Sequence, residues 1–255
     1  MHRNSDLELA LLEYDAERYF MAEKFAQYCL AKDPEDGPAL EVLGLSQVRS
    51  GALELGIDSL EHAALLCVIS KEAQLALAIA YGGVGRTELS RDLLMSAATG
   101  SDLNDRELLV VAAGLEAVDE PVLAMEACRQ AGVMAPENAE VHFQMGYYAS
   151  RCEYPSSVIE ALMRHAIGLE PQNLNFRIGL SSLLIRLERS TEAIKILAPL
   201  IPDRLEEVTC VCCLKRIANL FFDCGEFELA KLCSNRRREL TGDTASPRVE
   251  TMENR

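Results

Sequence analysis

A spacing of 34 residues recurs along most of this chain. Small residues stand one period apart at Ala22, Gly56, Ser90 and Ala124. Two more series keep the same step: Ala26, Leu60, Leu94 and Cys128, then Cys29, Ala63, Ala97 and Ala131. The three series are offset by four and seven residues, about one and two helical turns, so they predict one face of a helix. Small residues on that face let another helix approach closely.

The same pattern continues toward the C-terminus with two slips in register. Its later members are Ile159, Met163 and Ala166, then Ala193, Leu197 and Leu200, and finally Ala230. One extra residue falls near Tyr154–Pro155 and about three fall around 201–205, where we expect turns. A second apolar stripe precedes each of these helices, which predicts helix pairs. Gly51, Gly85 and Gly225 fall between the two helices of a pair, where a left-handed capping residue is expected.

These positions resemble the tetratricopeptide repeat. The clearest instances are Leu43-Gly44 with Gly51, Leu60 and Ala63, and Phe221 with Gly225 and Ala230. The resemblance implies an all-α, right-handed helical-repeat solenoid of about seven helix-turn-helix units. It covers residues 3–240, as repeats at about 3–36, 37–70, 71–104, 105–138, 139–173, 174–207 and 208–240. Residues 241–255 lose the period and mix Thr, Gly, Ser, Pro and charges, so we expect a disordered C-terminal tail.

Composition fits a helical protein of the cytoplasm. Trp is absent, and Tyr and Phe number only seven each, so the core must come from Leu, Ala, Ile, Val, Met and Cys. The acidic start of the chain does not resemble a signal peptide, and no apolar stretch reaches the roughly 20 residues of a membrane span. Nine Cys, an odd number, favour reduced thiols over a disulfide framework. We therefore expect a cytoplasmic protein without membrane insertion.

The net charge of −15 is confined to the first part of the chain. Residues 1–140 hold 25 acidic and 10 basic side chains, whereas residues 141–255 hold 15 of each. Such an acidic surface repels nucleic acid and attracts basic protein segments at long range, although it can also serve solubility alone. The expected partner is a protein or peptide, and basic segments are the favoured kind.

In proteins with this repeat, the first helix of each unit lines a concave groove. The resemblance implies that the groove of this chain is mostly apolar and suits an amphipathic helix or an extended segment. Contacts with neighbouring helices, or the chain's own tail, are the alternative use of these side chains. The implied protein-binding residues are Leu45, Leu75, Ile79, Leu109, Phe143, Tyr147, Ile178, Ile185, Lys215, Asn219 and Phe222.

Other constellations carry less information. Lys215 and Asn219 resemble part of a carboxylate clamp, but the following basic residues that a clamp needs are missing. Cys210, Cys212 and Cys213 invite a zinc hypothesis, yet on a continuous helix Cys212 leaves the face that the other two share. No catalytic triad, phosphate loop or His-Glu-x-x-His motif is present, so we expect no enzyme, cofactor or metal.

The leading hypothesis is thus a non-catalytic scaffold or adaptor that captures a partner segment. A chaperone that shields an apolar segment of a client, and a regulatory subunit of an enzyme, are the alternatives.

Overall fold

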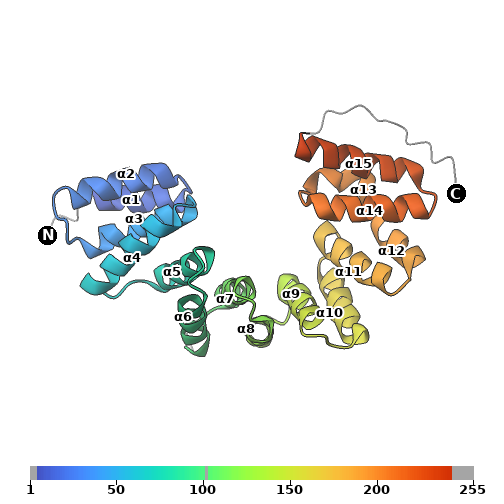
Figure 1. The fold of residues 1–255 in the computed structure, drawn as a ribbon, viewed down its shortest axis with the longest axis horizontal. Helices are drawn as coiled ribbons and strands as arrows, with labels where there is room; N and C mark the ends of the chain where they lie inside the picture. Colours follow the sequence, from blue (N-terminus) through green and yellow to red (C-terminus); the bar gives the residue numbers. More distant parts are fainter. Residues whose placement is uncertain (1–4, 101–102, 243–255) are drawn as a thin grey trace. The chain divides into compact units, whose positions relative to one another are not determined.

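The computed structural model describes residues 5–100 and 103–242, and within them the chain forms only helices and turns (Figure 1). The prediction of an all-α helical-repeat fold is confirmed. The chain separates into two compact units, Met1–Pro136 and Glu137–Arg255, called here the N-terminal unit and the C-terminal unit. The prediction of one continuous array over residues 3–240 stays a prediction.

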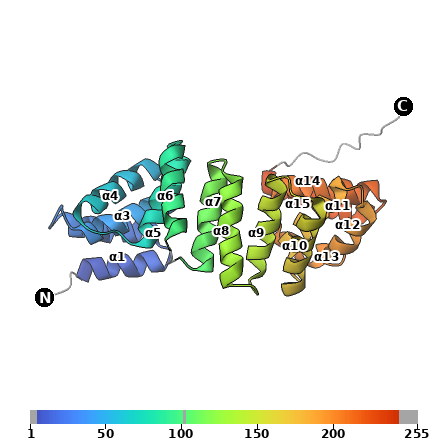
Figure 2. The same ribbon diagram turned by 90° about the horizontal axis from the view of Figure 1, so that it is seen from below.

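The N-terminal unit consists of four helix pairs. Each first helix packs on its own second helix, as α7 and α8 illustrate in Figure 2. The first helices α1, α3 and α5 also contact the first helix of the next pair. The bounds are α1 (Ser5–Asp15), α2 (Tyr19–Leu30), α3 (Gly37–Arg49), α4 (Leu53–Leu66), α5 (Lys71–Gly83), α6 (Thr87–Thr99), α7 (Asp105–Ala117) and α8 (Pro121–Met134).

The C-terminal unit has three helix pairs and one irregular insertion. Its bounds are α9 (Ala139–Arg151), α10 (Ser156–Leu169), α11 (Leu174–Arg186), α12 (Ser190–Leu197), α13 (Ile201–Arg204), the 3₁₀ helix η1 (Leu205–Glu207), α14 (Val211–Asp223) and α15 (Phe227–Thr241). The predicted tail, 241–255, lies outside the described residues from position 243 on. Thr241 is the last residue of α15, and Gly242 caps that helix.

Close packing within each pair depends on the small residues of the 34-residue series. A Cβ atom on Gly44 of α3 would lie 2.6 Å from Leu60 Cγ and 3.1 Å from the carbonyl oxygen of Gly56 on α4. A Cβ atom on Gly56 would lie 2.6 Å from Val48 Cγ2. The two helices therefore approach backbone to backbone, which excludes larger side chains here. The equivalent Ala22 and Ala124 are fully buried.

The register also fixes where first helices begin. From α3 onward, the side chain of the residue before each first helix accepts a hydrogen bond from a backbone N–H group in the first turn. That N–H group has no partner within the helix itself, so the cap satisfies it. These N-caps recur with the period and are Asp36, Ser70, Asn104, Asn138, Asn173 and Cys210.

Every first helix ends in the same left-handed turn. The predicted positive φ is present at Gly51 (88°), Gly85 (83°) and Gly225 (83°). The other four pairs place an acidic residue in this conformation, at Glu17, Asp119, Glu153 and Glu188. In all seven turns the next residue donates its N–H to a carbonyl five residues earlier, at 2.8–2.9 Å. This is the Schellman closure, and it holds even where the side chain disfavours the backbone angle.

Both slips in register are visible. Pro155 is the extra residue, because it stands between the capping turn at Glu153–Tyr154 and the start of α10. The second slip is not a simple turn. Helix α12 ends after eight residues, and the added chain forms α13 and η1, which pack against α15. Leu200, expected on the buried face of α12, lies beyond that helix and is half-buried, while Ile201 is fully buried.

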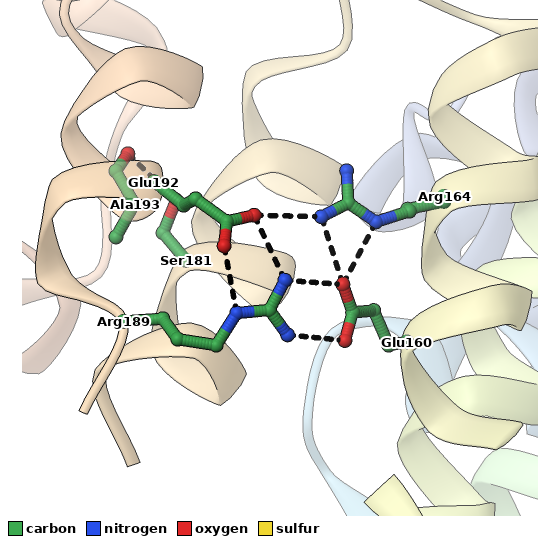
Figure 3. A network of polar contacts seen from close by, with 6 residues as sticks. All are labelled: Glu160, Arg164, Ser181, Arg189, Glu192 and Ala193. Atoms are coloured by element: carbon green, nitrogen blue, oxygen red, sulfur yellow. Dashed lines mark hydrogen bonds and ion pairs between the residues drawn. The ribbon is translucent and has the colours of Figure 1, made fainter. Parts of the chain in front are cut away.

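A network of charges joins α10 to the start of α12 (Figure 3). Arg189 binds both carboxylate oxygens of Glu160, at 2.7 and 3.1 Å, and both oxygens of Glu192, at 2.7 and 2.8 Å. Arg164 closes the network with bonds to Glu160 at 2.8 Å and Glu192 at 3.2 Å. The Arg189 guanidinium, followed by that of Arg164, lowers the pKa of Glu160 below its ordinary value. Within the second helix pair of the C-terminal unit, Ser181 of α11 donates to the Ala193 carbonyl oxygen of α12 at 3.4 Å.

No helix of the described residues combines the length and the apolar character that crossing a membrane requires.

We predict that Gly225→Ala lowers the unfolding free energy by about 1 kcal/mol, because alanine resists the left-handed conformation. A Cβ atom at Gly225 meets nothing within 4 Å, so the change tests the backbone alone. Gly168→Ala is the matched control: its Cβ also meets nothing, but the residue lies in α10 with no positive φ. In the control, the unfolding free energy should rise by about 0.5 kcal/mol. Equal effects in urea unfolding would contradict this account of the turn.

The charge network predicts a pH-dependent contribution. Because the folded pKa of Glu160 is lowered, its stabilising effect is present above the unfolded pKa, about 4.3, and is lost as the pH falls through the folded pKa. Glu160→Gln should therefore melt at a lower temperature than the wild type at pH 7, and the difference should vanish in acid. Melting curves from pH 7 to pH 3 test this. A difference that stays constant over that range would show that Glu160 contributes nothing through its charge.

Candidate functional site

The C-terminal unit contains a hollow of about 780 Å³. Four predicted groove residues meet in it: Phe143 and Tyr147 from α9, and Ile178 and Ile185 from α11. They converge because residues four or seven positions apart share one face of a helix, and α9 and α11 are the first helices of neighbouring repeats. The remaining lining residues are Ser150, Met163, Asn175, Gly179, Ser182, Leu183, Arg186, Val208, Cys210, Cys213 and Arg216.

The apolar part of the hollow is built on a pair of stacked rings. Phe143 stacks on the buried Phe176, with ring centroids 4.7 Å apart and an angle of 27°. Gly179 makes room for this arrangement, because a Cβ atom there would lie 2.5 Å from Phe143 Cε2. The 34-residue period gives no signal for Gly179, because the side chain that requires a glycine there belongs to another repeat. The Phe143 ring is thus fixed in orientation by its neighbours.

Within this hollow, Tyr147 offers the most accessible aromatic surface. It is 41% exposed, while Ile178 is 6% exposed and Phe143 and Ile185 are half-buried. The Tyr147 ring meets that of the buried Tyr148 edge to face at 5.1 Å, which holds it against the unit. A partly exposed aromatic ring of fixed position is the usual anchor of a protein interface.

Two arginines give the hollow a positive charge. Arg216 Nη1 donates to Ser182 Oγ at 2.7 Å, and Arg186 Nη2 donates to Ser150 Oγ at 3.1 Å. Hydroxyl partners leave both guanidinium charges uncompensated within the lining, which contains no Asp or Glu. The sequence analysis missed both residues. The sequence does contain a signal for Arg186, because arginine also occupies the last position of a first helix at Arg49 and Arg151. The 34-residue period contains no such signal for Arg216.

The predicted residues of the last repeat lie outside this lining. Lys215 and Asn219 of α14 are exposed, and Phe222 is 61% exposed with its ring 5.5 Å from that of Phe227. The structure therefore does not bring them together with the four residues of the hollow.

The predicted residues of the N-terminal unit span the same range of burial as those of the hollow. Leu45 and Leu75 are 5% and 6% exposed, Leu109 is half-buried, and Ile79 is 40% exposed. The first helices of this unit also carry a polar cluster that the sequence analysis did not anticipate. Tyr14 donates to Glu72 Oε1 at 2.6 Å, and Arg49 Nη2 lies 3.1 Å from the same oxygen. Burial, together with the bond to Glu72, raises the pKa of Tyr14 to about 12.

Three thiols cluster on one side of the hollow. Cys210 and Cys213 belong to its lining, and the Sγ atoms of Cys210, Cys212 and Cys213 all lie within 4.8 Å of one another. Hydrogen bonds from the thiols of Cys212 and Cys213, helped by the Cys213 N–H, lower the pKa of Cys210 to about 7. Burial raises the pKa of Cys213 to about 12. The sequence argument that Cys212 must leave the shared face is wrong, because Cys210 is not helical but is the N-cap of α14.

No protein-family model matches the sequence, and no curated protein matches it. Solved structures do resemble the fold. A tetratricopeptide repeat protein from Parabacteroides merdae has a TM-score of 0.70 at 14% identity, covering 94% of this chain and 93% of its own. The APC/C hetero-tetramer Cut9–Hcn1 has a TM-score of 0.65 at 11% identity, covering 92% of this chain. This chain spans only 45% of the length of the matched chain in that structure.

YrrB, described as a tetratricopeptide repeat protein with an unusual peptide-binding site, gives a TM-score of 0.53 at 15% identity over 71% of this chain. At such identities these likenesses show the fold. The chain is folded as a tetratricopeptide-repeat protein, and the resemblance read from the sequence is confirmed.

We predict that Gly179→Ala displaces the Phe143 ring and weakens its stack on Phe176, at a cost of about 1 kcal/mol. Urea unfolding of a double-mutant cycle with Phe143→Leu measures the coupling. In the Phe143→Leu background, Gly179→Ala should lower the unfolding free energy by clearly less than it does in the wild type. If Gly179→Ala costs the same in both backgrounds, the glycine is not needed for the ring.

Proposed function

We propose that this chain is a non-catalytic interaction scaffold whose C-terminal unit captures an extended or amphipathic segment of a partner protein. The observation that carries this proposal is the hollow in which Phe143, Tyr147, Ile178 and Ile185 converge. An apolar hollow with a few polar groups at defined positions is the general form of a binding site. The peptide-binding site named for YrrB supports the proposal by analogy of fold.

The chemistry of the lining selects the kind of segment. An aromatic or long aliphatic side chain would pack against Tyr147 and the ring of Phe143. An acidic side chain next to that anchor would reach Arg186 or Arg216, and a carboxylate bonds to a guanidinium more strongly than a serine hydroxyl does. The favoured partner is therefore an acidic amphipathic segment. Apart from Cys210 and Cys213, the lining consists of arginines, serines, one asparagine and apolar groups, which supports a binding role.

The acidic N-terminal unit supports a separate expectation. Its negative charge favours basic segments of a partner through long-range attraction. A partner with both kinds of segment would satisfy both units. We place this function in the cytoplasm, in keeping with the odd number of cysteines, nine, which favours reduced thiols over a disulfide framework.

A peptide-display selection against the whole chain tests the proposal. We predict enriched peptides that carry an aromatic or aliphatic anchor beside Asp or Glu. Tyr147→Ser should weaken the best of them by at least about tenfold, the effect of a 1.4 kcal/mol loss at an aromatic anchor. Arg216→Glu should weaken the same peptides and reduce the selection for acidic residues.

Tyr154→Ser is the matched control, because Tyr154 is 46% exposed in the same unit but does not line the hollow. It should bind the peptides as the wild type does. Equal loss in both tyrosine variants, or enrichment of basic peptides that ignore Tyr147, would refute the assignment of the hollow as the binding site.

A further inference from the structure

We propose that Cys210, Cys212 and Cys213 form a binding site for one thiophilic metal cation at the start of α14. Two of its three thiols, Cys210 and Cys213, also line the hollow, but the proposal does not rest on peptide capture. The inference rests on the three sulfur atoms, which come from four consecutive residues and meet within 4.8 Å. It reverses the expectation from the sequence that these thiols hold no metal.

The N-cap conformation of Cys210 produces this meeting. Its backbone is extended (φ −81°, ψ 109°), and its Sγ turns back to accept the N–H of Cys213 at 3.4 Å. The same turn brings Cys210 Sγ to 2.8 Å from Cys212 Sγ. With metal–sulfur bonds of about 2.3 Å, three thiolates around one cation lie about 3.8–4.0 Å apart. The three Sγ atoms, with one pair at 2.8 Å and none farther apart than 4.8 Å, lie near that spacing.

The surroundings favour thiolates. The first turn of α14 directs backbone N–H groups toward Cys210, and helix N-termini stabilise thiolates. Arg216, on the same helix, lines the same hollow as Cys210 and Cys213 and adds positive charge. Cys210 and Cys212 are exposed and Cys213 is half-buried, so a cation could enter without unfolding of the helix.

The donor set indicates which cations fit. Among the described residues, the group that could hold an ion here consists of three cysteines, with no His, Asp or Glu. Thiolates select soft cations, Cu(I) above all, and three-coordinate Cu(I) needs no further ligand. Zn(II) prefers four ligands, so water would have to complete its shell at this exposed position. Both cations share the thiolate chemistry, and Cu(I) fits the set better.

The test is a titration of the reduced whole chain without oxygen, in separate arms with Cu(I) and with Zn(II), against a competing chelator. Ultraviolet thiolate-to-copper absorbance reports Cu(I) binding, and chelator absorbance reports Zn(II). We expect one equivalent of Cu(I) per chain. The triple change Cys210→Ser, Cys212→Ser and Cys213→Ser should weaken binding at least about a hundredfold. Serine at position 210 keeps the N-cap, because serine is a preferred capping residue.

Cys224→Ser is the control, since Cys224 is an exposed thiol just after the other end of α14. It should bind like the wild type. If circular dichroism shows that the triple variant does not fold, the single change Cys212→Ser replaces it as the test. Cys212 is exposed, so its substitution should leave the fold intact, and it must still lower the affinity for the cation. The proposal is overturned if neither cation binds more tightly to the wild type than to the serine variants, or if Cys224→Ser abolishes binding.

Discussion

The structure depends on the close approach of the two helices within each pair. Where Gly44 faces Gly56, the backbones of α3 and α4 come so near that a single added carbon would meet a carbonyl oxygen at 3.1 Å. The left-handed turn that joins each pair closes with the same hydrogen bond in all seven cases, even when Glu153 or Asp119 must adopt a positive φ. Pair geometry therefore takes precedence over local side-chain preference. It is this repeated geometry that places the first helices side by side and lets their side chains form a common surface.

The hollow lies where the repeats of the C-terminal unit become irregular. Helix α12 is only eight residues long, and the chain that follows it forms α13 and η1 before α14 begins. Val208 and Cys210, both from the end of this irregular stretch, complete the lining that Tyr147 and Ile178 begin. A strictly regular array would present the same surface at every step. The irregular stretch supplies a local shape, and Arg216 of α14 adds a local positive charge.

The period predicts much of the fold because each of its positions has one physical reason that recurs. Ala22 and Leu60 are buried because helices cross there, and Gly51 and Gly225 adopt a positive φ because a helix must end there. The same register predicts that Phe143, Tyr147, Ile178 and Ile185 face one side, and the structure brings these four together. Gly179 and Arg216 escape such reasoning, because the Phe143 ring and the Ser182 hydroxyl that explain them belong to neighbouring repeats. Cys210 escapes it as well, since the preceding register slip obscures that Cys210 is the N-cap of α14, where the backbone is extended as at the other first helices.

The central claim is that partner segments bind in the hollow of the C-terminal unit. Hydrogen–deuterium exchange of the whole chain tests it most directly, with and without a peptide that carries an aromatic anchor beside acidic residues. Because bound peptide would cover α9, α11 and the first turn of α14, the account predicts slower amide exchange in these three helices. Unchanged exchange there, or protection confined to the N-terminal unit, would contradict it.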